Sequence, residues 1–136
     1  GERIEAVFME HTGLALCEDR IAVIVYEGMS FSGRNPVDLM RLRASYTTDV
    51  KKGTLIHELA HRFTFNVNYK ATVDEHEIIN LFLCDVWVEL YGTDFAKQMV
   101  KHEKSLNSLY VAAWEKILVL SKEVRQEKWQ QFLQLH

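Results

Sequence analysis

The sequence predicts an α+β fold, in which a few N-terminal strands form a small sheet and a helical bundle follows. Two observations favour early strands: the β-branched, apolar run Ile21–Tyr26 and the alternation of apolar and polar residues over Leu39–Tyr46. A third favours later helices, because helical spacing of apolar residues dominates from Thr48 onward. The 136 residues fit one domain, residues 1–136, long enough to bury a core without disulfides or a structural metal.

The first part of the chain is expected to alternate short elements with loops. Apolar residues at helical spacing predict a helix over Ile4–His11, which Gly13 ends. The run Ile21–Tyr26 is typical of a buried strand, and Leu39–Tyr46 of a half-buried strand near a sheet edge. Between them, the loop Gly28–Asn35 is expected to be a plain connector, with a place beside a functional cleft as the alternative.

Helical spacing predicts five helices in the rest of the chain. Thr48 or Asp49 is expected to cap the first and Thr93 or Asp94 the third, because short polar side chains accept hydrogen bonds from free helix N–H groups. Gly92 is placed to end the second. The five are Lys51–Asn66, Asp74–Leu90, a helix carrying Phe95, Met99 and Val100, then Tyr110–Leu120 and Val124–Leu135. Their aromatic stripe is expected in the core: Trp114, Trp129 and Phe132.

Composition argues against several classes of function. The net charge of −3 is spread over mixed acidic and basic residues without a basic stripe, so nucleic acid is not an expected partner. Apolar runs stay below the roughly 18–20 residues that a membrane helix needs, so no membrane is expected as a partner either. Cys17 and Cys84 are far apart, which suits a reducing compartment, and a cytoplasmic location is therefore expected. The sequence does not predict an oligomeric state.

The motif that carries chemistry is the HExxH sequence from His57 to His61, with Glu58 in second place. Two histidines four residues apart lie one above the other on a helix, so both rings can bind one metal ion. Such nitrogen ligands favour Zn²⁺, and a catalytic zinc keeps one coordination position for water. Glu58 is placed to act as the general base that takes a proton from this water. Chance would produce the motif roughly 0.02 times in a chain of this composition.

This segment resembles the active-site helix of zincin metallopeptidases, which differ from one another in their third metal ligand. The metzincin pattern HExxHxxGxxH is absent, because Thr64 and Val67 stand at the positions of its glycine and last histidine. A third ligand is therefore expected farther along the chain, where the segment Asp74–Glu77 offers a dense group of candidates.

Two kinds of zincin give two choices for this ligand. His76 follows His61 at a spacing similar to that of SprT-like proteases. Glu77 would instead make the chain resemble a compact gluzincin, such as the minigluzincins or ImmA-like peptidases. Leu81, however, stands where the usual gluzincin helix has an aspartate. We therefore prefer His76, with Glu77 as the alternative and Glu75 as a more distant one.

Other side chains could assist a zinc site. Asp85, inside an apolar helical stretch, is expected either to orient a ligating histidine or to pair with Arg62 or a lysine. A developing oxyanion needs a hydrogen-bond donor. The sequence offers four candidates without choosing among them: Tyr46, Tyr69, Tyr110 and His102.

The resemblance implies a zinc-dependent peptidase that hydrolyses peptide bonds with metal-activated water and Glu58 as the base. Zincins align their substrate on an edge strand, so the resemblance also implies that a peptide or protein substrate adds to the open edge of Leu39–Tyr46. Two alternatives stay open: a zincin-fold binding or regulatory domain with weak or no hydrolysis, and an amidase acting on a non-protein substrate. Glu58 argues against the first, since a structural zinc needs no base.

Overall fold

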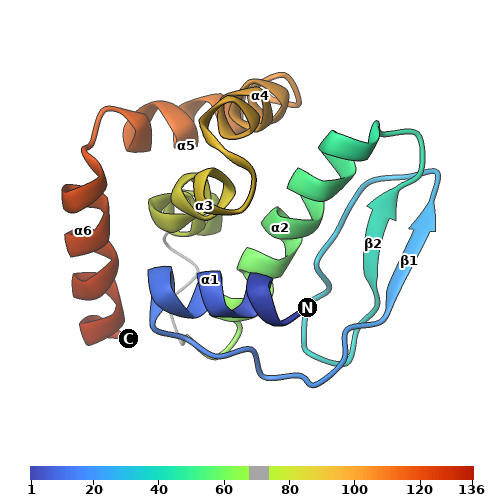
Figure 1. Cartoon of the computed structure of the whole chain (residues 1–136), viewed down its shortest axis with the longest axis horizontal. Helices are drawn as coiled ribbons and strands as arrows, with labels where there is room; N and C mark the ends of the chain where they lie inside the picture. Colours follow the sequence, from blue (N-terminus) through green and yellow to red (C-terminus); the bar gives the residue numbers. More distant parts are fainter. Residues whose placement is uncertain (68–73) are drawn as a thin grey trace.

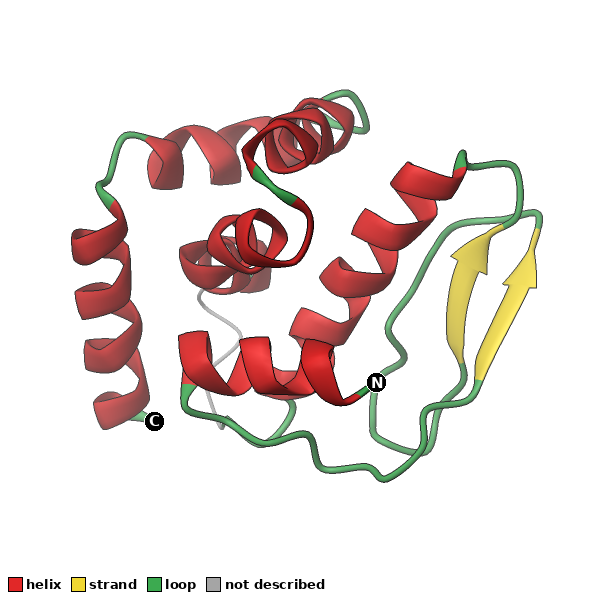
Figure 2. Ribbon diagram, viewed as in Figure 1, coloured by secondary structure: helices red, strands yellow, loops and turns green. Residues whose placement is uncertain are grey.

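The computed structural model describes residues 1–67 and 74–136, and it confirms an α+β fold (Figures 1 and 2). A narrow ribbon of strands lies at one side of the molecule and the helices form the rest (Figure 2). The elements in chain order are α1 (Glu2–Thr12), β1 (Val23–Tyr26), β2 (Met40–Arg43), α2 (Thr48–Thr64), α3 (Glu75–Tyr91), α4 (Thr93–Lys104), α5 (Ser108–Leu118) and α6 (Lys122–Leu135).

Helix α3 is the centre of the helical bundle, and the other five helices pack around it (Figure 1). It is apolar on nearly every side, as a helix surrounded by neighbours must be. Five of its side chains are completely buried: Ile79, Asn80, Leu83, Val86 and Trp87. The predicted aromatic core is also confirmed, because Trp114, Trp129 and Phe132 are all buried.

Strands β1 and β2 form a parallel pair, in which Val23 lies opposite Met40. Strand β2 is half-buried as predicted: Met40 and Leu42 are buried, the residue between them is exposed, and the strand packs on α2. The expectation that Ile21–Tyr26 is a buried strand is wrong. Strand β1 lies at the outer edge of the ribbon, where Val23 is 43% exposed and Val25 56% exposed (Figure 1).

Strand β2 has neighbours on both sides, so the expectation of an open substrate-binding edge is wrong. Strand β1 covers one edge. On the other, Phe31 and Arg41 exchange backbone hydrogen bonds of 2.9 and 2.8 Å in an antiparallel bridge. The Arg43 N–H also donates to Ser30 Oγ. Ser30 and Phe31 therefore contact the strand pair, so the segment Gly28–Asn35 is more than a connector.

Several helix ends follow the predicted chemistry. Asp74 caps α3, and Gly92 ends it. Gly13 ends α1 with φ at 71°, a left-handed conformation that glycine adopts without steric cost. In residues 1–67 and 74–136, none of the helices combines the length and apolar character that a membrane crossing requires.

Two expected helix caps are wrong in position. The cap of α2 is Thr47, one residue before the expected Thr48. Its backbone is extended, and its side chain accepts a hydrogen bond from the Val50 N–H. Helix α4 begins directly after Gly92, which offers no side chain. The four expected caps are first-turn residues instead: Thr48, Asp49, Thr93 and Asp94.

Candidate metal centre

Helix α2 carries His57, Glu58 and His61, and all three side chains are buried. The helix is held between α3 on one side and the strand ribbon on the other, since it contacts both α3 and β2. One helical turn separates the two histidines, and their ring centroids lie 5.0 Å apart. The predicted proximity of the two rings on one helix face is therefore confirmed.

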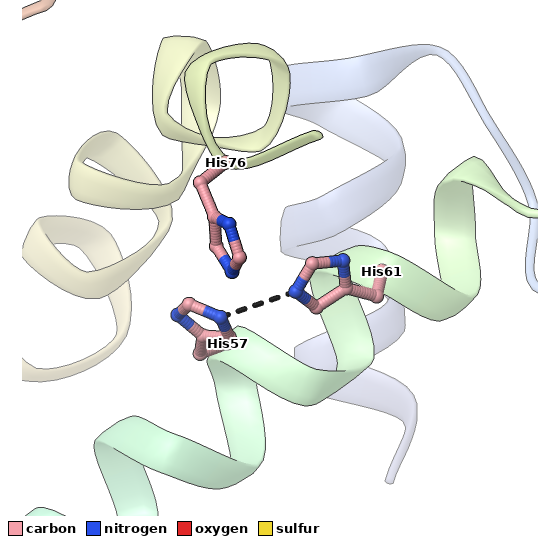
Figure 3. A group of neighbouring side chains, drawn as sticks. All are labelled: His57, His61 and His76. Atoms are coloured by element: carbon pink, nitrogen blue, oxygen red, sulfur yellow. Dashed lines mark hydrogen bonds between the residues drawn. The ribbon is translucent and has the colours of Figure 1, made fainter. Parts of the chain in front are cut away.

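The third histidine comes from the start of α3. The Asp74 side chain caps this helix by accepting a hydrogen bond of 2.9 Å from the His76 N–H. The same carboxylate oxygen lies 3.3 Å from His76 Nδ1, so the cap also orients the ring. The His76 ring centroid lies 5.5 Å from that of His57 and 5.2 Å from that of His61. Figure 3 shows the three rings converging on one point.

These three histidines could hold a metal ion. One ligand nitrogen from each of His57, His61 and His76 lies within 4.8 Å of the others. His57 Nε2 and His61 Nε2 are 3.1 Å apart (Figure 3). Two nitrogens that bind one tetrahedral zinc at 2.0–2.1 Å are separated by roughly 3.3 Å. The spacing of this pair therefore fits a shared ion.

The outer nitrogen of each histidine on α2 faces a carboxylate. His57 Nδ1 is hydrogen-bonded to Glu103, and His61 Nδ1 lies 2.8 Å from Glu75 Oε1. A histidine that donates from Nδ1 presents the lone pair of Nε2. Two such lone pairs repel each other at 3.1 Å unless a proton or a metal ion lies between them. Either a proton on one of the two nitrogens or a metal ion bound by both would remove this repulsion.

Burial and charge shift the proton affinities of this cluster in different directions. Burial lowers the pKa of His57, but the Glu103 carboxylate outweighs it, and the pKa rises to about 9. Burial and the neighbouring charges of His57 and His61 lower the pKa of His76 to about 4. Burial raises the pKa of Glu58, which the same two histidines partly offset. His76 is therefore a neutral ring with a lone pair to donate at neutral pH.

The alternative third ligand lies elsewhere. The Glu77 carboxylate pairs with Lys116 on α5 and does not join the three histidines. Asp85 also differs from its expected roles, because its partner is neither a histidine, nor Arg62, nor a lysine. Its carboxylate accepts hydrogen bonds of 2.7 and 3.3 Å from Arg125 on α6.

Two adjoining cavities, of about 370 and 580 Å³, meet at the cluster. The first includes Thr54, one turn before His57 on α2, and the second includes Thr64 near the end of that helix. Together they form a cleft that follows α2, with Glu58 near its middle. Five residues line both cavities: Met29, Ser30, His57, Glu58 and Tyr110. The segment Gly28–Asn35 thus forms a wall of the cleft, which was the alternative reading of this loop.

Arg62, completely buried on α2, holds this wall in place. Its guanidinium donates hydrogen bonds to the backbone oxygens of Ser32 at 2.6 Å, Pro36 at 2.8 Å and Asp38 at 2.6 Å. It also pairs with Glu18 at 3.1 Å. The helix that carries the histidines therefore also fixes the opposite side of the cleft.

The candidates for oxyanion stabilisation separate in space. The Tyr110 ring lies 4.6 Å from that of His76 and 6.1 Å from that of His57, and it lines both cavities. Burial raises the pKa of its phenol, with Glu103 and Glu58 adding to the effect, so the hydroxyl stays a donor. Tyr46 and His102 line only the first cavity, and Tyr69 lies outside the described residues.

Glu103, which contacts His57 from the last turn of α4, was not predicted from the sequence. A signal was present in the sequence. Met99 and Val100 form the apolar stripe of this helix, and Glu103 follows them at spacings of four and three residues, so it lies on the buried face. A charged residue in register with an apolar stripe indicates a buried partner, but the partner's identity depends on tertiary contacts.

Comparisons with protein-family models, with curated proteins and with solved structures found no match to this chain.

Proposed function

We propose that this chain is a zinc-dependent peptidase, in which His57, His61 and His76 hold the metal and Glu58 is the general base. The observation that carries the proposal is the convergence of three histidine nitrogens beside the Glu58 carboxyl, at the junction of two cavities. A merely structural metal would need neither the cleft nor the carboxyl group.

The chain's own groups divide the reaction among them. A zinc ion bound here would lower the pKa of a water molecule and polarise the carbonyl to be attacked. Glu58 accepts the proton of the attacking water and passes it to the departing amine. Tyr110 donates a hydrogen bond to the oxyanion.

The shape of the cleft favours a polypeptide substrate. The two cavities extend from the cluster toward both ends of α2, from Thr54 to Val67, so a chain can pass over Glu58 and continue on either side. An amidase for a small molecule would be served better by one enclosed pocket. Cleavage of internal peptide bonds is therefore the activity that we propose.

The test combines metal content with peptide hydrolysis. Wild-type protein should hold about one zinc per chain, measured by elemental analysis after dialysis, and should cleave a library of internally quenched peptides. Glu58→Gln should keep the metal but lower kcat by about 10²–10⁴-fold, because only the base is lost. If wild type binds zinc and cleaves nothing in the library, the chain is a metal-binding or regulatory domain. If the purified protein takes up no zinc even in excess, the proposal fails altogether.

The role of Tyr110 is tested against a matched tyrosine. Tyr110→Phe should lower kcat by about 10²–10³-fold with metal content unchanged, because one oxyanion donor is removed. Tyr46→Phe removes a hydroxyl from the first cavity only and should change kcat by much less. Equal losses in the two variants would contradict the assignment of Tyr110.

A further inference from the structure

We propose that Glu103 is a positioning residue that fixes His57 with its Nε2 atom toward the metal. The inference rests on the proposed metal centre and concerns a residue outside the HExxH motif. Both oxygens of this carboxylate are engaged: one with His57 Nδ1, the other as acceptor of a 2.7 Å hydrogen bond from Trp114 Nε1. Glu103 is only 4% exposed, so little of its carboxylate faces bulk solvent.

The carboxylate is anchored through the core to the helix that it serves. Trp114 is completely buried and stacks on Trp87, with ring centroids 5.8 Å apart. Trp87 Nε1 in turn donates to the backbone oxygen of Gly53, one turn before His57 on α2. The Glu103 carboxylate is therefore held in position by contacts that involve four helices: α2, α3, α4 and α5. Such anchoring is what a residue needs if it is to hold an imidazole ring in a single orientation.

Stability alone does not explain a glutamate at this position. It lies in the last turn of α4, where the helix dipole disfavours negative charge. Burial of a carboxylate is also unfavourable unless a partner compensates for the lost hydration. The other two carboxylates on the histidines differ, because the Glu75 and Asp74 side chains are 39% and 37% exposed. Of these three carboxylates, Glu103 is thus the one that loses most of its hydration in the folded protein.

The contact with Glu103 selects one form of His57. A carboxylate accepts a hydrogen bond from Nδ1–H, so Nδ1 keeps its proton and Nε2 is the nitrogen that faces the cluster. Glutamine cannot reproduce this pair of contacts. Its single side-chain oxygen can accept from His57 or from Trp114, and its NH₂ group then faces the other N–H.

The experiment measures zinc affinity by competition with a chromophoric chelator. Glu103→Gln should bind zinc about 10–100-fold more weakly than wild type, as outer carboxylates of zinc-bound histidines typically contribute. Glu75→Gln should lose less, because its carboxylate is solvated. The matched control is Asp85→Asn, which removes another buried carboxylate, on Arg125, and should leave zinc affinity unchanged. An equal loss in Asp85→Asn would mean that general destabilisation explains the result, which overturns the proposal.

A second readout needs no variant and keeps the proposal testable if Glu103→Gln fails to fold. Nitrogen NMR of zinc-loaded wild type should show His57 protonated at Nδ1 and ligating through Nε2. The opposite assignment overturns the role of Glu103 and leaves the metal centre intact. Conversely, zinc binding with the expected Glu103 effect but without hydrolysis would contradict the peptidase proposal alone. Unchanged zinc affinity in a folded Glu103→Gln protein also overturns the inference.

Discussion

Helix α2 and strand β1 reverse the usual relation between polarity and burial. Helix α2 buries four ionisable side chains, His57, Glu58, His61 and Arg62, each at most 8% exposed. Strand β1 is purely aliphatic over Val23–Val25, yet these residues are 43–56% exposed. Buried polar groups are retained only where partners or function compensate for their desolvation. This contrast supports placing the proposed function on α2, whereas β1 is the outer edge of the strand ribbon.

The largest expected effect comes from removing a ligand on α2. His61→Ala should retain less than about a tenth of the wild-type zinc after dialysis, because a catalytic site needs three protein ligands. Elemental analysis measures the content, and circular dichroism checks that the helices persist. Retention of full zinc content by this variant would show that His61 does not bind the ion. It would contradict the proposal that α2 carries two metal ligands.

The next effect concerns the stability that Arg62 provides. Arg62→Met should lower the free energy of unfolding by about 3–5 kcal/mol, because it leaves the Glu18 carboxylate without its partner and four backbone oxygens without this donor. Urea denaturation measures the change. Lys52→Met, an exposed cation on the same helix, is the control and should change stability by no more than about 0.5 kcal/mol. Similar losses of stability in the two variants would mean that the buried Arg62 guanidinium contributes no more to stability than an exposed cation.

A smaller loss of stability should follow from truncating a buried side chain of β2. Leu42→Ala should lower the free energy of unfolding by about 2–3 kcal/mol, since Leu42 is 7% exposed and the variant leaves a cavity beside α2. Thermal or urea denaturation measures it. A change below about 0.5 kcal/mol would indicate that the ribbon does not pack on α2 in solution.

The smallest effect is expected on β1. Val25→Thr should change the free energy of unfolding by at most about 0.5 kcal/mol, because the side chain is 56% exposed and threonine keeps the β-branched shape. The same denaturation experiment, repeated at several protein concentrations, sharpens the comparison. A loss above about 1 kcal/mol that grows with concentration would mean that another copy of the chain covers β1.

Features of the fold that depend on local interactions could be predicted from the sequence. Features that depend on contacts between distant residues could not. Helices α2 and α3 were predicted because their apolar spacing and the Asp74 and Gly92 signals are local. The pairing of Asp85 with Arg125 was not, because the partners are 40 residues apart. The exposure of β1 was missed for a related reason, since an apolar run predicts a strand but does not tell what covers it.

The sequence by itself determined the fold class, the aromatic core and the pair His57 and His61, because four-residue spacing on a helix brings two side chains together without any tertiary contact. Only the tertiary structure decided between His76 and Glu77 for a place beside that pair. Adjacent helical residues point in directions about 100° apart, so the packing of α3 on α2 and α5 turns His76 toward the cluster and Glu77 toward Lys116. The tertiary structure also brings Glu103 on α4 into contact with His57, 46 residues away in the sequence. Side-chain partners at such separations are fixed by how helices pack, which no local pattern encodes.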